Sequence, residues 1–322
     1  MIYLNADNIK DIGIHWHQLI KVIETSILAL HKKDYSQPIK PYLRYGDPKN
    51  RIIAMPAYIG GDAPYAGIKW IASFPDNIHK NKLRAHSVTI LNEYDSGIPL
   101  CVINTAIVSA IRTASLSGLV VKEYLKTKIE DQPFTVGIIG FGPIGQMHLN
   151  MITAVLGNRA TKIKLFDINP IDISTIDNEL ADRIEISQSW QECYADTDIF
   201  MTCTVSDKPY IDVAPKKGSL QLNVSLRDYK AEMRQYMDVI IVDDWDEVCR
   251  QNTDIENMHQ VTGLQKSDTI SIVDLVCYKD SLSGSDDQVV MLNPMGMAVF
   301  DIAVGGYYYR EALSKNVGLQ MV

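Results

Sequence analysis

The sequence predicts an α/β protein that combines a Rossmann-type, doubly wound parallel sheet with a mixed α+β domain. From residue 134 onward, continuous apolar runs alternate with segments of helical pattern, which is typical of parallel strands covered on both faces. A glycine-rich turn follows the first of these runs. The preceding strand-like segments instead follow one another and end in a hairpin pattern. A chain of 322 residues is long enough for about two domains.

The first domain, residues 1–115, is predicted to begin with an amphipathic helix over residues 16–33. Its apolar residues recur at helical spacing: Leu19, Ile23, Ile27 and Leu30. The segments RIIAMPAYI and YAGIKWIAS have strand character, and HSVTILNEYDSGIPLCVIN predicts a hairpin that turns at DSG. A long helix is then expected from about residues 104–105 through IVSAIRTASLSGLVVKEYLK.

The second domain, residues 116–301, has the alternating pattern of a dinucleotide-binding fold. FTVGII predicts a strand, GFGPIG a turn, QMHLNMITAVL a helix and IKLFDI a second strand. Further strands are expected at DIFMTCTV, SLQLNVS and DVIIVDD. The C-terminal helix, residues 302–322, is predicted to return to the first domain.

Composition argues against several classes of function. Lysine and arginine total 31 against 39 acidic residues, a net charge of −8 without a basic run, so we expect no nucleic-acid or membrane partner. The N-terminus is too polar for a signal peptide, and the longest apolar stretch, residues 98–111, is too short to span a bilayer. Five scattered cysteines without a CxxC pair predict reduced thiols, a cytoplasmic location and no metal site.

Gly140, Gly142 and Gly145 form a GxGxxG motif between a predicted strand and a predicted helix. Such a turn brings backbone N–H groups and a helix N-terminus to a pyrophosphate. Asp167 ends the next strand, 22 residues after Gly145, where a carboxylate can bind ribose hydroxyls and repel a 2′-phosphate. The motif therefore favours NAD over NADP, although a glycine-rich turn that binds nothing is the simpler alternative.

Three cations of the first domain stand in unusual surroundings. Lys69 lies inside the strand-like run YAGIKWIAS, Arg112 interrupts an apolar helix, and Arg44 precedes the RIIAMP strand. Each could be explained alone, as a lysine that reaches solvent or an arginine in an ordinary ion pair. Together they suggest a pocket for carboxylates, because arginine offers a bidentate fork and lysine a compact charge.

Asp228 follows the apolar strand SLQLNVS. The carboxyl ends of strands in a doubly wound sheet border the ligand crevice, so this carboxylate could exchange a proton with a substrate amine. It could equally cap a helix formed by the following KAEMRQYM.

Several of these segments together resemble the ornithine cyclodeaminase/mu-crystallin family: GIKW, SAIRTA, GFGPIG, TCTVSD and GMAVFD. The likeness extends over nearly the whole chain. It implies a homodimeric NAD enzyme in which Arg44, Lys69 and Arg112 grip the substrate carboxylate, and Lys69 and Asp228 serve catalysis. It also implies the residues that line the cofactor: Thr113, Gly140, Gly142, Pro143, Ile144, Gly145, Asp167, Thr202, Thr204 and Met297.

Other segments, QPIKPYLR, RIIAMPAYIGG, IVDDWDEVCRQ and LNPMGMA, are similar to a subgroup that supplies 2,3-diaminopropionate for siderophores and peptide antibiotics. This likeness implies NAD-dependent cleavage of N-(1-amino-1-carboxy-2-ethyl)-L-glutamate to 2,3-diaminopropionate and 2-oxoglutarate. Ornithine cyclodeaminase, a related imino-acid reductase and a mu-crystallin-like ligand-binding protein are the alternatives. The cyclodeaminases carry a glutamate two residues before their Met-Pro, where this chain has Ile53.

Overall fold

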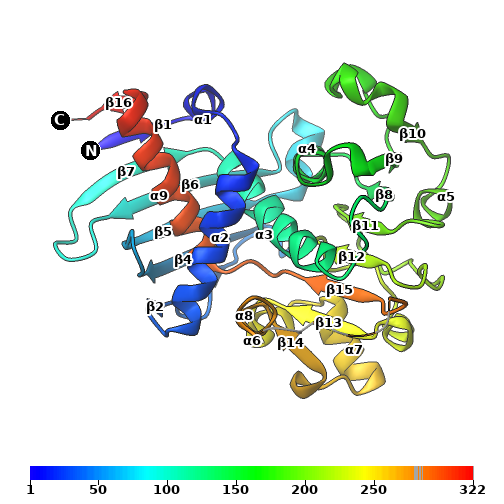
Figure 1. Ribbon diagram of the computed structural model, residues 1–322. Helices are drawn as coiled ribbons and strands as arrows, with labels where there is room; N and C mark the ends of the chain where they lie inside the picture. Colours follow the sequence, from blue (N-terminus) through cyan, green and yellow to red (C-terminus); the bar gives the residue numbers. More distant parts are fainter. Residues whose placement is uncertain (279–281, 283, 285, 322) are drawn as a thin grey trace. The chain divides into compact units, whose positions relative to one another are not determined.

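The computed structural model describes residues 1–278, 282, 284 and 286–321. The chain divides into two compact units, which are described one at a time (Figure 1). Unit 1 comprises Met1–Ser115 and the chain from Met297 onward, and unit 2 comprises Leu116–Gly296. Helix α3 (Ile107–Leu125) belongs to both units, because the boundary lies within it.

Unit 1 is built on a mixed sheet in the order β16-β1-β7-β6-β5-β4-β2, with β3 beside β4. Its strands are β1 (Ile2–Leu4), β2 (Tyr35–Ser36), β3 (Tyr42–Leu43), β4 (Arg51–Ile59), β5 (Tyr65–Ser73), β6 (Ala85–Asn92), β7 (Pro99–Asn104) and β16 (Leu319–Gln320). The β6–β7 pair confirms the predicted hairpin. All paired neighbours are antiparallel except β1 and β7.

Helices cover one face of this sheet. Helix α9 (Ala298–Lys315) packs against β4, β5 and β6, while α1 (Ala6–Ile12) and α2 (Trp16–His31) pack against α9 (Figure 1). The predicted helix over residues 16–33 is confirmed, and its apolar stripe is fully buried at Leu19, Ile23 and Ile27. Burial of this stripe supplies the hydrophobic free energy that holds the helix in place.

Unit 2 contains a parallel sheet in the order β10-β9-β8-β11-β12-β15-β13-β14. Its strands are β8 (Phe134–Ile139), β9 (Ala160–Phe166), β10 (Ile184–Ile186), β11 (Ile199–Thr202), β12 (Leu220–Asn223), β13 (Val239–Val242), β14 (Thr269–Ser271) and β15 (Val290–Asn293). Every paired neighbour runs parallel. The predicted doubly wound fold is therefore confirmed. The strand order reverses between β8 and β11, where folds of this type bind ligands.

The α-helices of unit 2 are α4 (Pro143–Leu156), α5 (Trp190–Tyr194), α6 (Trp245–Val248), α7 (Asp254–Thr262) and α8 (Ile272–Cys277), in addition to its share of α3. The strands β11, β12 and β15 are buried along their whole length, as continuous apolar runs predict.

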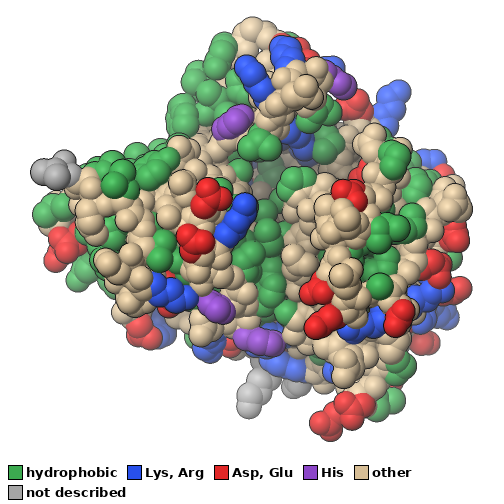
Figure 2. Space-filling view, turned by 90° about the horizontal axis from the view of Figure 1, so that it is seen from above, with side chains coloured by type: hydrophobic (Ala, Val, Ile, Leu, Met, Phe, Trp, Pro, Cys, Tyr) green, Lys and Arg blue, Asp and Glu red, His purple; other side chains and the backbone are tan. Residues whose placement is uncertain are grey.

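On the face drawn in Figure 2, acidic and basic side chains are interspersed.

Candidate active site

Lys69 does not turn its ammonium to solvent. It lies in the middle of β5, paired with Met55 on β4 and Thr89 on β6, and it is only 2% exposed. Since side chains alternate along a strand, Trp70 points to the opposite face and is 42% exposed. The first alternative considered for Lys69, a solvated side chain, is therefore wrong.

Lys69 and Arg112 meet on one buried carboxylate. Lys69 Nζ lies 2.8 Å from Asp301 Oδ2, and Arg112 Nε lies 2.9 Å from Asp301 Oδ1. Lys69 Nζ also donates to Ser109 Oγ at 3.2 Å. Arg112 and Ser109 come from α3 and Asp301 from α9, so two helices and a strand of unit 1 hold this cluster. We call Lys69, Arg112, Ser109 and Asp301 the cation cluster.

Electrostatics within the cation cluster favour the binding of an anion. Burial lowers the pKa of Lys69 to about 8; the Asp301 carboxylate opposes this shift, and the charges of Arg112 and Lys40 add to it. Although burial disfavours its ionised form, Asp301 has a lowered pKa because Arg112 and Lys69 stabilise the carboxylate. Asp301 is thus an anion that faces two cations. A bound carboxylate would stabilise the protonated form of Lys69 further.

The cation cluster retains hydrogen-bond donors. Arg112 uses Nε for its ion pair, and within the described residues nothing bonds to its two terminal nitrogens. Lys69 donates two hydrogen bonds, to Ser109 and to Asp301, and so uses two of its three N–H groups. A guanidinium with free terminal nitrogens is suited to bidentate recognition of a carboxylate.

Arg44, the third predicted cation, lies apart from these contacts. It follows β3 in an exposed segment, donates to Pro48 O at 3.1 Å, and lies 5.5 Å from the ring centre of Tyr42. Lys40, which the sequence did not single out, is instead 4% exposed and close enough to influence Lys69.

The glycine turn is closely packed at two of its three glycines. Gly140 has φ of +83°, and a Cβ there would lie 2.6 Å from backbone atoms of Cys203. A Cβ at Gly145 would lie 2.1 Å from Gly140 O, so this glycine lets α4 approach the turn closely. A Cβ at Gly142 would meet no described atom within 4 Å. The turn is therefore tight at its ends and open at its centre.

The N-terminus of α4 is open as well. Gly142 is its N-cap residue and provides no side-chain cap, and Pro143 and Ile144 form the first helical positions. The leading N–H groups of such a helix and its dipole attract phosphate.

Asp167 follows β9 and holds the glycine turn. Its Oδ2 accepts the Phe141 N–H at 2.7 Å, and its Oδ1 accepts the Asn169 N–H at 2.9 Å. A carboxylate has about four lone-pair directions, so ribose hydroxyls could still bind to it. The next residue, Ile168, is 91% exposed.

The remaining predicted cofactor residues divide between the two units. In unit 2, Thr202 ends β11 at the reversal of strand order and donates to Asn223 Oδ1 at 3.0 Å. Thr204 follows two residues later and donates to Asp228. In unit 1, Thr113 lies beside Arg112 on α3 and donates to Ser109 O at 2.8 Å, and Met297 is the buried N-cap residue of α9.

Asp228 lies in the turn after β12 and is fully buried. Hydroxyl groups surround its carboxylate: Thr204 donates to Oδ1, Ser225 donates to Oδ2, and Tyr210 forms a further side-chain hydrogen bond. Burial raises the pKa of Asp228, and the hydroxyl groups of Thr204, Tyr210 and Thr202, together with the charge of Arg227, only partly oppose the rise. A carboxyl with a raised pKa is a better proton acceptor near neutral pH.

The helix-cap alternative for Asp228 is wrong. KAEMRQYM forms a 3₁₀ turn, Ala231–Tyr236, whose N-cap residue is Lys230.

Sequence reasoning missed Asp301, Ser109, Asn223 and Asp254. Asp301 lies within the quoted GMAVFD segment, and a lone acidic residue in the apolar helix AVFDIAVGG was a usable signal. Asn223 and Asp254 gave no comparable signal, because polar residues at strand and helix ends are common.

No three His, Cys, Asp or Glu side chains in the described ranges are grouped as metal ligands. Within the same ranges, no helix has the length and apolarity needed to cross a membrane.

Unit 2 is a Rossmann dinucleotide-binding unit by three features: an open glycine turn, an uncapped helix and an acidic residue after the second strand. Residues 5–316 match the ornithine cyclodeaminase/mu-crystallin family, and the chain belongs to this family.

Relatives of known activity agree with this assignment. The chain is 32% identical to N-((2S)-2-amino-2-carboxyethyl)-L-glutamate dehydrogenase of Staphylococcus aureus, over 99% of this chain and 97% of the relative. Its fold is similar to that of Thermococcus litoralis Δ1-pyrroline-2-carboxylate reductase, solved with NADH and L-proline, with a TM-score of 0.88, 20% identity and full coverage of both chains. It is also similar to an archaeal alanine dehydrogenase dimer with bound NAD, with a TM-score of 0.85, 23% identity, and coverage of 100% of this chain and 99% of the other.

Proposed function

We propose that the protein is an NAD-dependent dehydrogenase of N-((2S)-2-amino-2-carboxyethyl)-L-glutamate, the compound also called N-(1-amino-1-carboxy-2-ethyl)-L-glutamate. The products are 2-oxoglutarate and L-2,3-diaminopropionate, a precursor for siderophores or peptide antibiotics. The cation cluster carries this proposal. A substrate with three carboxylates needs donors of the kind that Arg112 and Lys69 retain.

The residues of unit 2 fit NAD. The open centre of the turn at Gly142, the uncapped α4 N-terminus and the Asp167 carboxylate match pyrophosphate and ribose. NAD bound there would supply the acceptor for the hydride on the glutamate Cα of the substrate.

Asp228 supplies the proton chemistry. The secondary amine must be neutral before the Cα–H bond can break, and a carboxylate with a raised pKa can take its proton. The oxidised product is an imine between the glutamate carbon and the diaminopropionate nitrogen. Water adds to this C=N bond, and the amine leaves after it is protonated, for which the Asp228 carboxyl group is the donor. The Thr204 and Ser225 hydroxyl groups keep the carboxylate oriented through both transfers.

Ile53 favours this substrate over ornithine. It lies on β4 opposite Ile71 and two residues from Met55, the partner of Lys69, so it shares the sheet face of Lys69. An apolar side chain here offers no charge for the second ammonium of a diamine.

The purified protein tests the proposal directly. With NAD and the synthetic substrate, we expect NADH to form together with equal amounts of 2-oxoglutarate and 2,3-diaminopropionate. Ammonia release from ornithine without net NADH would instead identify a cyclodeaminase. Absence of turnover with both substrates, while either of them still binds, would favour a mu-crystallin-like binding protein.

Asp167→Ala should weaken NAD binding and relax the discrimination against NADP. The substitution removes the proposed ribose contact and a negative charge that would repel a 2′-phosphate. It also leaves the Phe141 N–H without its acceptor, so the turn loses support. Dissociation constants for NADH and NADPH, measured by fluorescence, check this. Asp172→Ala, in an exposed turn of the same unit, is the control. An unchanged ratio of the NADPH and NADH dissociation constants in Asp167→Ala would refute the ribose assignment.

Binding of 2-oxoglutarate should weaken as the pH rises through about 8. The pKa of Lys69 is lowered to about 8, mainly by burial, so the ammonium is present below this pH and lost above it. This product carries two carboxylates and no amine, so it does not titrate in this range. Inhibition constants between about pH 6 and 10 measure the effect, with Lys69→Arg as the comparison because guanidinium stays charged. An equal pH dependence in both proteins would assign the effect to another group.

We also propose that the protein is a cytoplasmic homodimer. The sheet face opposite Lys69 presents Ile68, Trp70, Val88 and Ile90, none of which is buried. A second copy could cover this face, and one relative of the same fold was solved as a dimer. Light scattering of the wild type and of Trp70→Asp tests this, with a monomeric wild type as the contrary result.

A further inference from the structure

The turn that carries Asp228 is held in an unusual conformation. Leu226 has φ of +63°, a left-handed conformation that costs free energy for a branched side chain. Such a turn persists only where surrounding contacts fix it. The Leu226 carbonyl accepts the Asp254 N–H at 2.8 Å, and the Leu226 N–H donates to Asn223 Oδ1 at 3.2 Å.

Asp254 is the centre of these contacts. Its Oδ2 accepts three N–H groups: Asn223 Nδ2 at 2.9 Å, the Asp228 backbone at 3.0 Å and the Tyr229 backbone at 3.2 Å. The residue is fully buried, and its Oδ1 has no hydrogen-bond partner among the described residues. A buried carboxylate is costly, and here its hydrogen bonds go to the turn itself.

A role in stabilising its own helix does not explain this arrangement. Asp254 is the first residue of α7, but Thr253 is the N-cap residue, and its side chain accepts the Glu256 N–H. The Asp254 carboxylate points back to the residues after β12. Asn223 extends the same network, since its Nδ2 also donates to Asn293 Oδ1 at 2.8 Å and its Oδ1 accepts from Thr202.

The two carboxylates are also coupled electrostatically. Burial raises the pKa of Asp254 to about 7, while its hydrogen bonds oppose the rise and the Asp228 charge adds to it. Ionisation of one group therefore disfavours ionisation of the other.

We propose that Asp254 is a positioning residue for Asp228: it holds the backbone N–H groups of residues 228 and 229 and thereby fixes the carboxylate that acts on the substrate amine. The role of Asp228 in this inference rests on the proposed function, whereas the geometry of the turn does not depend on it. Asp254 is fully buried and its carboxylate accepts from protein N–H groups, so it acts through Asp228.

Two variants test the inference in the NAD-saturated enzyme. Asp254→Asn keeps an oxygen that can accept the three N–H groups but removes the charge, whereas Asp254→Ala removes the acceptor. We expect kcat to fall by about tenfold in the first and further in the second, since the first loses the charge that strengthens these hydrogen bonds and the second loses the acceptor as well. The KM and the NAD dissociation constant should stay within about twofold of wild type, because Asp254 is fully buried and its carboxylate accepts from protein N–H groups.

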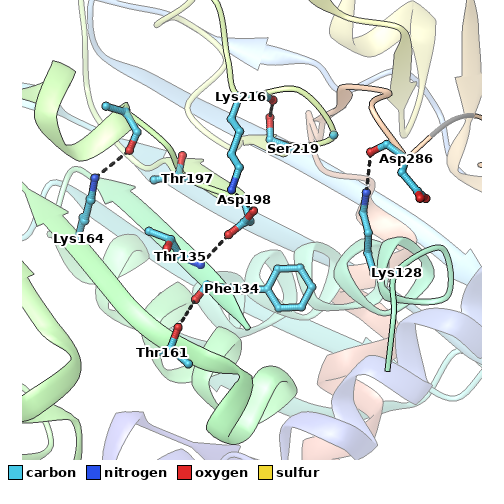
Figure 3. Close-up of polar contacts among 12 residues, drawn as sticks. Lys128, Phe134, Thr135, Thr161, Lys164, Thr197, Asp198, Lys216, Ser219 and Asp286 are labelled. Carbon is cyan, nitrogen blue, oxygen red and sulfur yellow. Dashed lines mark hydrogen bonds and ion pairs between the residues drawn. The ribbon is translucent and has the colours of Figure 1, made fainter. Parts of the chain in front are cut away.

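Asp198→Asn is the matched control. Asp198 also accepts a backbone N–H, from Thr135 at 2.8 Å, and it forms an ion pair with Lys216, but it lies before β11 rather than after a strand (Figure 3). This change should lower the melting temperature without a change in kcat, so it separates lost stability from lost positioning.

Hydrogen exchange provides a readout that needs no substrate. Amides of residues 225–229 should exchange about tenfold faster in Asp254→Ala than in the wild type, whereas amides of β8 and α4 should exchange at the wild-type rate. If the wild type fails to oxidise the substrate, the proposed function fails while exchange still decides whether Asp254 fixes the turn. Three results in folded Asp254→Ala would each overturn the inference. They are unchanged hydrogen exchange, an unchanged kcat, and a loss of NAD affinity as large as the loss of kcat.

Discussion

Replacement of Asp228 by asparagine is expected to lower turnover by about 10²–10⁴-fold, the usual contribution of a positioned acid or base. Asparagine has nearly the same shape: its oxygen can accept a hydrogen bond from one of the two hydroxyl groups, Thr204 or Ser225, and its NH2 group can donate to the other, but it cannot take up a proton. NAD affinity should remain at the wild-type level, because the glycine turn and Asp167 are untouched. Stopped-flow detection of NADH and fluorescence titration of the cofactor measure the two quantities.

Asp212→Asn is the control for this prediction. Asp212 lies in the same unit, is 48% exposed and forms an ion pair with Lys230, so its loss should change neither turnover nor stability by much. Turnover within tenfold of wild type in Asp228→Asn would show that another group moves the proton.

The pH dependence of the wild type provides an independent check on Asp228. Burial raises its pKa, so the carboxylate is protonated at a higher pH than an ordinary aspartate. As the pH falls through this raised pKa, the base is lost and kcat/KM should decline. The acid limb should therefore lie above the ordinary pKa of 3.8 and should disappear in the residual activity of Asp228→Asn.

Local patterns were sufficient to predict the fold class. FTVGII, GFGPIG and the following helix form a strand, turn and helix in the expected order, because a buried parallel strand must be apolar throughout and a tight turn needs glycine at Gly140. Boundaries were less accurate. The helix expected from residues 104–105 begins at Ile107, since Asn104 still pairs in β7.

The partners of the site residues could not be predicted in the same way. Lys69 was recognised as unusual, but its partner Asp301 is 232 residues away in the sequence. The choice between a solvated and a buried lysine depends on that distant carboxylate, which no local pattern specifies. Asp254 could not be predicted for the same reason, because it lies 26 residues after Asp228 and contacts its backbone rather than its side chain.

Replacement of Asp301 by alanine should strongly destabilise unit 1. The substitution leaves Lys69 and Arg112 as two adjacent buried cations without their shared anion. Loss of one partner of a buried ion pair typically costs about 3–5 kcal/mol. Urea denaturation followed by circular dichroism measures the change in the free energy of unfolding. Glu311→Ala, on the same helix and in a partly exposed pair with Lys315, should change it by less than about 1 kcal/mol.

A double substitution separates lost charge balance from lost packing. If unpaired cations cause the destabilisation, Lys69→Met in the Asp301→Ala background removes one of them and should restore part of the stability, even though it removes a second polar side chain. If an empty space at Asp301 were the cause, the second change would leave the stability unchanged or lower it. Partial recovery would therefore support the view that Asp301 is needed to balance the buried charges of Lys69 and Arg112.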